Sequence, residues 1–402
     1  MAVFGMVSAV SGFVKIRYLL DKAIIDNMVF RCHYRITTAI LFVCCIIVTA
    51  NNLIGDPISC INDGSIPMHV INTFCWITYT FTIPGQQHKQ IGTDVAAHGL
   101  GNEFGQEKRY HSYYQWVPFV LFFQGLMFYV PHWIWKNLED GKMRMITEGL
   151  RGMVVVPEDY RKDRQNRIIK YIMASLNSHN GYSFGYFFCE ALNFVNVILN
   201  IFMVDRFLGG AFMTYGTDVI KFSNMDQDRR FDPMIEVFPR LTKCTFHKFG
   251  PGGSPQRHDT LCVLALNILN EKIYIFLWFW FIILSVISGV AMLYSLVVVM
   301  MPTTRETIIK RTYRQGQSKD IAGLIRRLDI GDFLLLHFLA QNVNTKAYGE
   351  MIQELCNILG SSRTPSAPST LEMHPIYPQV DSVDSYGKEN FGKESFGKET
   401  ET

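Results

Sequence analysis

Charged residues are scarce in this chain of 402 residues. Asp, Glu, Lys and Arg together make up 18% of it, whereas an average soluble domain has about 25%. Hydrophobic residues make up 49%, and the mean hydropathy is +0.11. This composition argues against a wholly soluble or disordered chain. It is still less apolar than a protein made mostly of membrane spans, so a few spans joined by large soluble parts fit best.

Several functional signatures are also missing. The net charge is +3, from 38 basic and 35 acidic residues, which gives no reason to expect nucleic-acid binding. The GPGG sequence at residues 250–253 lacks the Lys and Ser/Thr of a phosphate-binding loop. No serine lies in a G-x-S-x-G setting, and the histidines are scattered. We therefore predict no catalytic residue, no cofactor and no enzyme activity.

The chain does contain four long stretches that are almost free of charge. About 20 apolar residues are enough to cross a bilayer as a helix. A buried core helix is the alternative for any one stretch, but four in one chain favour the membrane. Trp133 and Trp135 lie toward a span end, where such rings favour the interface. The predicted spans are residues 36–55, 113–135, 183–204 and 273–302.

Basic residues predict the orientation of these spans. Residues 1–35, 136–180 and 302–402 carry 26 Lys and Arg, and the segments between them, 55–112 and 205–272, carry 12. Cytoplasmic segments are enriched in basic residues, so both termini and the middle loop are predicted to be cytoplasmic. The predicted soluble segments are an N-terminal segment (15–35), an outer loop (56–112), a cytoplasmic loop (136–182), a second outer loop (205–272) and a cytoplasmic helical region (303–360).

The cytoplasmic segments show amphipathic helical patterns. Ile168, Ile169 and Ile172 recur at helical spacing in the middle loop. Residues 320–340 predict another helix, and a further one follows with Asn344 or Thr345 as its cap. Residues 361–402 are rich in Ser, Pro and charge and end in a three-fold repeat, so we predict disorder there.

Residues 1–14 form a short apolar stretch without the basic start of a secretory signal. One side of the predicted helix is apolar and the other is small and weakly polar. This pattern suits either a helix packed on one side and open to water on the other, or a membrane-surface anchor. The apolar side consists of Val3, Met6, Val7, Val10 and Val14, and the small side of Gly5, Ser8, Ser11 and Gly12.

The outer loops contain two cysteines each. Cys60 and Cys75 lie in the first loop, and Cys244 and Cys262 in the second. In an oxidising compartment they suggest two disulfides, for which three connectivities are possible. A zinc site is the alternative, because the second loop also spells C-x2-H…H-x3-C. That alternative would leave Cys60 and Cys75 as an isolated pair, so we predict no metal.

Glu190 is the only acidic residue inside a predicted span. Intramembrane acids usually face a partner or a water-filled cavity and are candidates for function. A purely structural hydrogen bond or ion pair is the other interpretation.

Several short motifs are distinctive. The clearest is YYQWVP at the start of the second span, formed by Tyr113, Tyr114, Gln115, Trp116, Val117 and Pro118. The others are PISCI around Cys60, HVINTFCWI around Cys75, the stretch from Phe238 to Trp280 and RLDIGDF from Arg327. All of them resemble motifs of the innexins, the gap-junction proteins of invertebrates. Together the similar stretches cover roughly residues 20–360.

The resemblance implies an all-α polytopic membrane protein. It would have four transmembrane helices, two disulfide-linked extracellular loops and a helical cytoplasmic domain. Such subunits assemble in the lipids of the plasma membrane into a homo-oligomeric, octameric hemichannel. The hemichannel docks with one of the neighbouring cell and passes ions and small solutes; heteromers with other innexins are a further expected partner.

The resemblance also assigns residues. It implies disulfides from Cys60 to Cys262 and from Cys75 to Cys244. The N-terminal helix would fold into the pore mouth, so that Gly5, Ser8, Ser11 and Gly12 face the permeant. The YYQWVP rings and Gln115 are expected to position the second span rather than to contact the permeant.

Two other functions stay open. One is an undocked, pannexin-like channel that releases small molecules, and the other is a pore-less tetraspan adhesion protein. The chain has no N-x-S/T sequon, which favours loops that dock, because a glycan would obstruct a docking face. The uncharged N-terminus and the helical cytoplasmic layer favour a gated pore over adhesion.

Overall fold

The structure is a computed structural model of the chain. It describes residues 23–361, apart from residues 63, 65, 104, 152–156, 224–231 and 314–317. The small face predicted to line the pore (Gly5, Ser8, Ser11 and Gly12) and the repeat tail lie outside the described residues.

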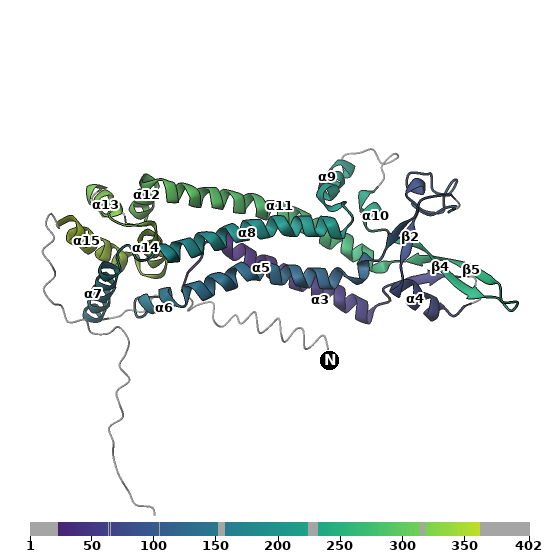
Figure 1. Cartoon of the computed structure of the whole chain (residues 1–402), viewed down its shortest axis with the longest axis horizontal. Helices are drawn as coiled ribbons and strands as arrows, with labels where there is room; N and C mark the ends of the chain where they lie inside the picture. The colour runs from purple at the N-terminus through teal and green to yellow at the C-terminus, as the bar shows by residue number, and fades with distance from the viewer. Residues whose placement is uncertain are drawn as a thin grey trace, which may run out of the picture. The chain divides into compact units, whose positions relative to one another are not determined.

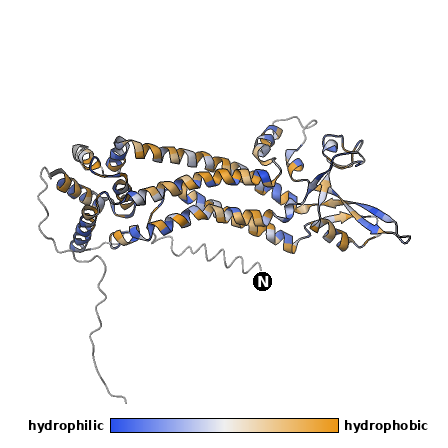
Figure 2. Cartoon of the chain, viewed as in Figure 1, coloured by the Kyte–Doolittle hydropathy of each residue, from blue (hydrophilic) through white to orange (hydrophobic). Residues whose placement is uncertain are grey.

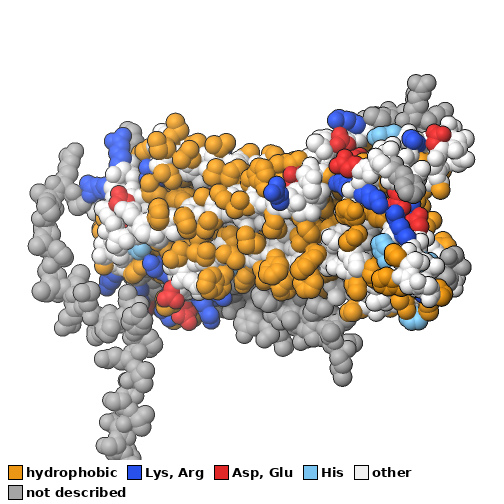
Figure 3. Space-filling view, turned by 45° about the vertical axis from the view of Figure 1, so that its right-hand side comes forward, with side chains coloured by type: hydrophobic (Ala, Val, Ile, Leu, Met, Phe, Trp, Pro, Cys, Tyr) orange, Lys and Arg blue, Asp and Glu red, His pale blue; other side chains and the backbone are white. Residues whose placement is uncertain are grey.

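Among the described residues, four helices are long and apolar enough to cross a membrane. The helices lie side by side (Figures 1 and 2), and apolar side chains cover the face of the bundle seen in Figure 3. The mostly helical, four-span class is therefore confirmed. The first runs through α2 (Met28–Arg31), the π-helical η2 (Cys32–Thr37) and α3 (Thr38–Ile54); the others are α5 (Val117–Glu139), α8 (Asn180–Phe207) and α11 (Ala265–Met300).

The helices extend beyond the predicted spans. Helix α11 has 36 residues, which corresponds to about 54 Å at 1.5 Å per residue and exceeds a hydrocarbon core of about 30 Å. Helix α5 starts where the YYQWVP motif ends, with Pro118 in its first turn, a position where proline needs no amide hydrogen. It ends where Asp140 and Gly141 adopt positive φ of 48° and 72°, a typical helix stop.

At one end of the bundle, the loop between spans one and two and the loop between spans three and four form a single five-stranded antiparallel sheet. The strand order is β1-β5-β4-β2-β3. No strand is predicted here from the sequence. Three of the strands have only three residues each, too few to show an alternating pattern. The strands are β1 (Ser59–Ile61), β2 (Thr80–Thr82), β3 (Arg109–His111), β4 (Leu241–Phe249) and β5 (Pro255–Val263).

Short helices surround this sheet and the adjacent span ends. Helix α4 packs on β1 and β4, and α9 packs on α8 and α11. They are α4 (Met68–Ile77), η3 (Pro84–Gln86), η4 (Tyr113–Gln115), α9 (Phe212–Ser223) and α10 (Pro233–Val237).

The opposite end is a helical domain with its own apolar core. Ile168, Ile169 and Ile172 are buried in that core, as their spacing predicted. Asn344 caps the last helix by accepting a hydrogen bond from the Lys346 amide at 2.9 Å. The helices are α6 (Lys142–Ile146), α7 (Glu158–Ala174), α12 (Pro302–Thr312), α13 (Ser318–Ile325), α14 (Ile330–Asn342) and α15 (Thr345–Ser361).

The single helix predicted over residues 320–340 is wrong. The chain breaks between α13, which ends at Ile325, and α14, which begins at Ile330. The break lets Asp332, at the start of α14, accept hydrogen bonds from the amide of Asn177 and the ring of His179, both at 2.8 Å. Gly331 permits this approach, because a Cβ there would lie 2.2 Å from the His179 backbone. The RLDIGDF motif therefore docks the helical domain onto the start of the third span.

Candidate functional site

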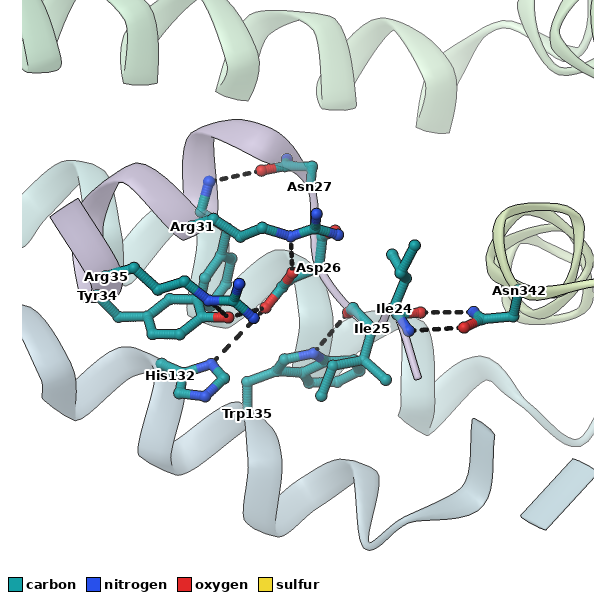
Figure 4. Close-up of polar contacts among 11 residues, drawn as sticks. Ile24, Ile25, Asp26, Asn27, Arg31, Tyr34, Arg35, His132, Trp135 and Asn342 are labelled. Atoms are coloured by element: carbon teal, nitrogen blue, oxygen red, sulfur yellow. Dashed lines mark hydrogen bonds and ion pairs between the residues drawn. The ribbon is translucent and has the colours of Figure 1, made fainter. Parts of the chain in front are cut away.

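A short extended segment, residues 23–27, joins the N-terminal residues to the first span; we call it the strap. The side-chain amide of Asn342, on α14, forms two hydrogen bonds with Ile24 (Figure 4). The Ile24 amide donates to Oδ1 at 2.6 Å, and Nδ2 donates to the Ile24 carbonyl at 2.7 Å. On α5, the indole of Trp135 donates to the Ile25 carbonyl at 2.8 Å. The strap is therefore fastened to both the helical domain and the second span.

Asp26 anchors the strap to the first turns of span one. It is 3% exposed, and its carboxylate accepts hydrogen bonds from Arg31 Nε at 2.6 Å and from the Tyr34 hydroxyl at 2.9 Å. Nδ1 of His132, on α5, lies 3.8 Å from the same carboxylate, and its ring stacks on Tyr34 at 3.6 Å. A buried carboxylate requires such partners. Asp26 therefore joins the strap to the first turns of span one and to α5.

Asn27 connects the strap to the third span. Its Oδ1 accepts from the Phe30 amide at 2.7 Å and so caps α2. Its Nδ2 donates to Oε1 of Glu190 at 2.7 Å. The intramembrane acid singled out in the sequence thus has a partner within the same chain, from a segment 163 residues away.

The second candidate site is the disulfide-bonded end, which we call the outer domain. Cys60 bonds Cys262 and Cys75 bonds Cys244, the pairing that the resemblance implied. Cys60 and Cys262 face each other across β1 and β5. Because Cys244 and Cys262 are in disulfides, they offer no thiolates for the alternative zinc site.

The YYQWVP motif, at the start of the second span, contacts the outer domain through hydrogen bonds and ring stacking. Tyr114 donates its hydroxyl to the Cys75 carbonyl at 3.2 Å and stacks on Trp76, while the Gln115 amide donates to the Trp76 carbonyl. These carbonyls belong to the last turn of α4, where helix carbonyls have no partner within the helix. The motif therefore caps the helix that carries Cys75.

The other motif residues divide between the protein interior and the bundle surface. Tyr113 packs on Phe238, and Val117 is fully buried. Trp116 is 59% exposed on the outside of the bundle. The carbonyl of Pro118 accepts from the Cys45 thiol of span one at 3.3 Å. The positioning role of the motif stays a prediction.

Charged and polar pairs fix the rest of the outer domain. Buried Glu271, at the start of α11, binds the guanidinium of Arg240, just before β4, with the shortest contact at 2.8 Å. Burial lowers the pKa of His111 to about 3, with a smaller effect from Arg109, and His111 Nε2 lies 2.8 Å from the hydroxyl of Thr82. His111 is thus held neutral between β2 and β3.

Glu103 is a further charged anchor of the outer domain. Burial by itself would raise the pKa of this carboxyl, but hydrogen bonds from Lys108 and Arg257 hold the pKa below its ordinary value. Arg257 lies on β5, so the contact ties the segment before β3 to the β4–β5 hairpin.

Most of the strap contacts have no signal in the local sequence. Asp26 and Asn27 directly precede an apolar run, which is a helix-start signal that could have identified Asn27 as a cap. No local pattern could have found Asn342, because it lies 318 residues from Ile24. Trp135 was also misplaced: it was expected at the membrane interface but is fully buried against the strap.

Four helices able to span a membrane, with a disulfide-bonded domain at one end and a helical domain at the other, define a polytopic membrane protein. The innexin family model matches residues 26–359. Innexin inx3 of Drosophila melanogaster is 82% identical over 97% of this chain and 99% of its own length. Innexin inx2 of the same species is 47% identical, over 88% and 95%, and Innexin shaking-B is 39% identical, over 85% and 92%.

This chain belongs to the innexin family, the gap-junction channel proteins of invertebrates. It is a multi-pass protein of the plasma membrane at gap junctions, and it forms oligomeric hemichannels.

Proposed function

We propose that eight copies of this chain form each hemichannel and that residues 1–14 line its cytoplasmic mouth. The subunit number follows from resemblance to the family, and mixed hemichannels with other innexins are part of the same proposal. The chain acts as a channel subunit and not as an enzyme.

The observation that carries the pore-mouth proposal is the strap. It follows residue 22 directly, and Asn342, Trp135 and Glu190 hold it through Ile24, Ile25 and Asn27. Because these contacts fix the start of span one, they limit where the preceding residues can lie. An uncharged face made of Gly5, Ser8, Ser11 and Gly12 would select weakly between ionic signs, which suits a pore for mixed solutes.

The pore mouth is tested by adding charge to each side of the N-terminal helix. Ser8→Asp places one negative charge per subunit in the mouth and should shift permeability toward cations. Val7→Asp places the charge on the packed side and should impair assembly or opening. Reversal potentials under a salt gradient test the first variant, and surface expression with conductance tests the second. Unchanged behaviour of both variants would favour the membrane-surface anchor instead.

The proposed orientation places the helical domain and both termini in the cytoplasm. The disulfides support it, because disulfides persist in oxidising compartments. A tag after Thr402 should be reached by antibody only after permeabilisation, whereas a tag at Gly252, in the exposed β4–β5 turn, should be reached on intact cells. The reverse pattern would overturn the orientation.

Measurements of dye and current transfer between paired cells distinguish a docked channel from an undocked release channel. Dye and current should pass between two cells only when both express the protein. Release of dye from single cells without transfer between pairs would support the pannexin-like alternative. Adhesion without current in either assay would support the pore-less one.

A further inference from the structure

A small cavity lies inside the helix bundle of the subunit, between spans one, three and four. Its volume is about 10 Å³, a size that admits a single water molecule. The walls are unusually polar for a site between membrane spans. The polar side chains that line it are Asn27, His33, Glu190, Asn193 and Ser288.

The hydrogen bonds around the cavity fix the tautomer of His33. The hydroxyl of Ser288 donates to the Leu284 carbonyl at 2.6 Å, since a carbonyl can only accept. Its oxygen must then accept from His33 Nε2, which lies 2.6 Å away. The proton of the neutral ring is therefore on Nε2, and Nδ1 carries a lone pair. That Nδ1 atom is buried and has no hydrogen-bond partner among the described residues.

Asn193 supplies a second pair of unsatisfied groups. Its side chain is on α8, three residues after Glu190, and the residue is 3% exposed. Neither its Nδ2 nor its Oδ1 has a partner within the described part of the chain. Buried amides and imidazole nitrogens are destabilising without hydrogen bonds, most of all in a membrane, where lipid offers none.

The backbone of span one contributes to the cavity. His33 lies in the π-helical stretch Cys32–Thr37, and π-helical turns are frequent at functional sites. The Thr37 hydroxyl donates to the Cys32 carbonyl at 3.0 Å and so gives that carbonyl a hydrogen-bond partner within the π-helical turn. The part of span one that carries His33 is thus π-helical, whereas the part that follows, from Thr38 to Ile54, is α-helical.

We propose that the cavity is a hydration site, in which an ordered water molecule donates a hydrogen bond to His33 Nδ1 and joins it to the amide of Asn193. The site lies beside the Asn27–Glu190 hydrogen bond, so water there hydrates the junction between the strap and the bundle. It lies within one subunit, between that subunit's own spans.

The test is hydroxyl-radical footprinting of the full-length channel in lipid nanodiscs, because radiolysis of bound water oxidises the side chains beside it. Phe30 and His33 line the cavity and are 1% and 0% exposed. They should be oxidised roughly tenfold more than Phe281, since a cavity of this polarity holds water. Phe281 is equally buried in the same bundle and does not line the cavity.

Asn193→Leu fills the cavity with an apolar side chain and should reduce oxidation of Phe30 and His33 to the level of Phe281. Val195→Leu, on the exposed side of the same helix, should leave oxidation unchanged. Equal protection of Phe30, His33 and Phe281 in the parent would show that the cavity is dry and overturn the proposal, whether or not the variant assembles. Unchanged oxidation in an assembled Asn193→Leu channel would also overturn it, because the radicals would then come from elsewhere.

Discussion

The amide side chain of Asn342 pairs with the backbone N–H and C=O of Ile24 as one strand residue pairs with another, by one donated and one accepted hydrogen bond. The same Nδ2 also donates to the Phe338 carbonyl at 2.8 Å. The amide is thus tied to its own helix while it holds the strap. A movement of α14 must therefore move the strap or break both hydrogen bonds.

Replacing Asn342 by Leu should release the strap. The Ile24 amide and carbonyl would lose their side-chain partner, at a cost of about 1–3 kcal/mol. We expect faster hydrogen exchange across residues 23–27 and altered junctional conductance at normal surface expression. Gln341→Leu, at an exposed neighbouring position, should change neither. If exchange in the strap is the same in both variants, Asn342 does not hold it.

Tyr114→Phe should loosen the helix that carries Cys75. The change removes the hydrogen bond to the Cys75 carbonyl, worth about 1 kcal/mol, and keeps the ring that stacks on Trp76. We expect a several-fold loss of coupling between paired cells, with currents of undocked hemichannels preserved. Tyr110→Phe makes the same chemical change at a residue that is 59% exposed and should couple normally. Equal coupling in the two variants would argue against the capping role.

Cys75→Ser should abolish coupling while sparing synthesis and much of the membrane insertion. The loss of one disulfide costs about 2–5 kcal/mol, which is enough to disorder a docking face. Cys356→Ser, at a cysteine of the helical domain outside the two disulfides, is the matched control. Mass spectrometry of non-reduced peptides checks the pairing. Free thiols at Cys60 and Cys262, or zinc bound at His247, would contradict it.

Acid should destabilise the pairing of β2 with β3. The pKa of His111 is lowered from 6.5 to about 3, so below pH 6.5 the unfolded state binds more protons than the folded state. The stability that neutral His111 contributes is complete above pH 6.5 and is lost as the pH falls toward 3. At pH 5 the loss is about 2 kcal/mol.

The measurement is hydrogen exchange of residues 80–82 and 109–111 at pH 7 and pH 5, corrected for the intrinsic rate. His111→Gln should remove most of the pH dependence, because glutamine can bond Thr82 but does not titrate in this range. His69→Gln, at an exposed site, should preserve the dependence of the parent. Identical pH responses in the parent and His111→Gln would exclude His111 as the cause.

The sequence predicts the spans better than what joins them. Runs of 20 or more residues that are almost free of charge favour membrane helices, and each predicted span overlaps one of the four long helices. Local spacing also places Ile168 and Ile172 in the core of the helical domain. These patterns depend only on residues of a single helix, so they can be recognised in the sequence of that helix alone.

Contacts between distant segments leave no comparable signal. The pairing of Asp332 with His179 depends on a break after α13 and on the space left by Gly331. In a sequence, a glycine indicates only a weaker helix, so Gly331 does not show that another segment packs against it. The strands β1 and β2 pair with β5 and β4 of the other loop, and β3 pairs with β2, so these short strands depend on distant partners rather than on a pattern of their own. Even the cysteine pairing came from resemblance, because spacing alone left three connectivities.

The nested disulfides impose an order on biosynthesis. Cys60 and Cys75 enter the oxidising lumen with the first loop, but their partners lie 202 and 169 residues further along the chain. Neither native disulfide can form until the ribosome has made span three and the second loop has crossed the membrane. During that interval the first loop carries two free thiols only 15 residues apart, which can bond each other. Oxidoreductases that delay or reverse this premature bond should therefore determine how much of the newly made protein reaches the cell surface in a form able to dock.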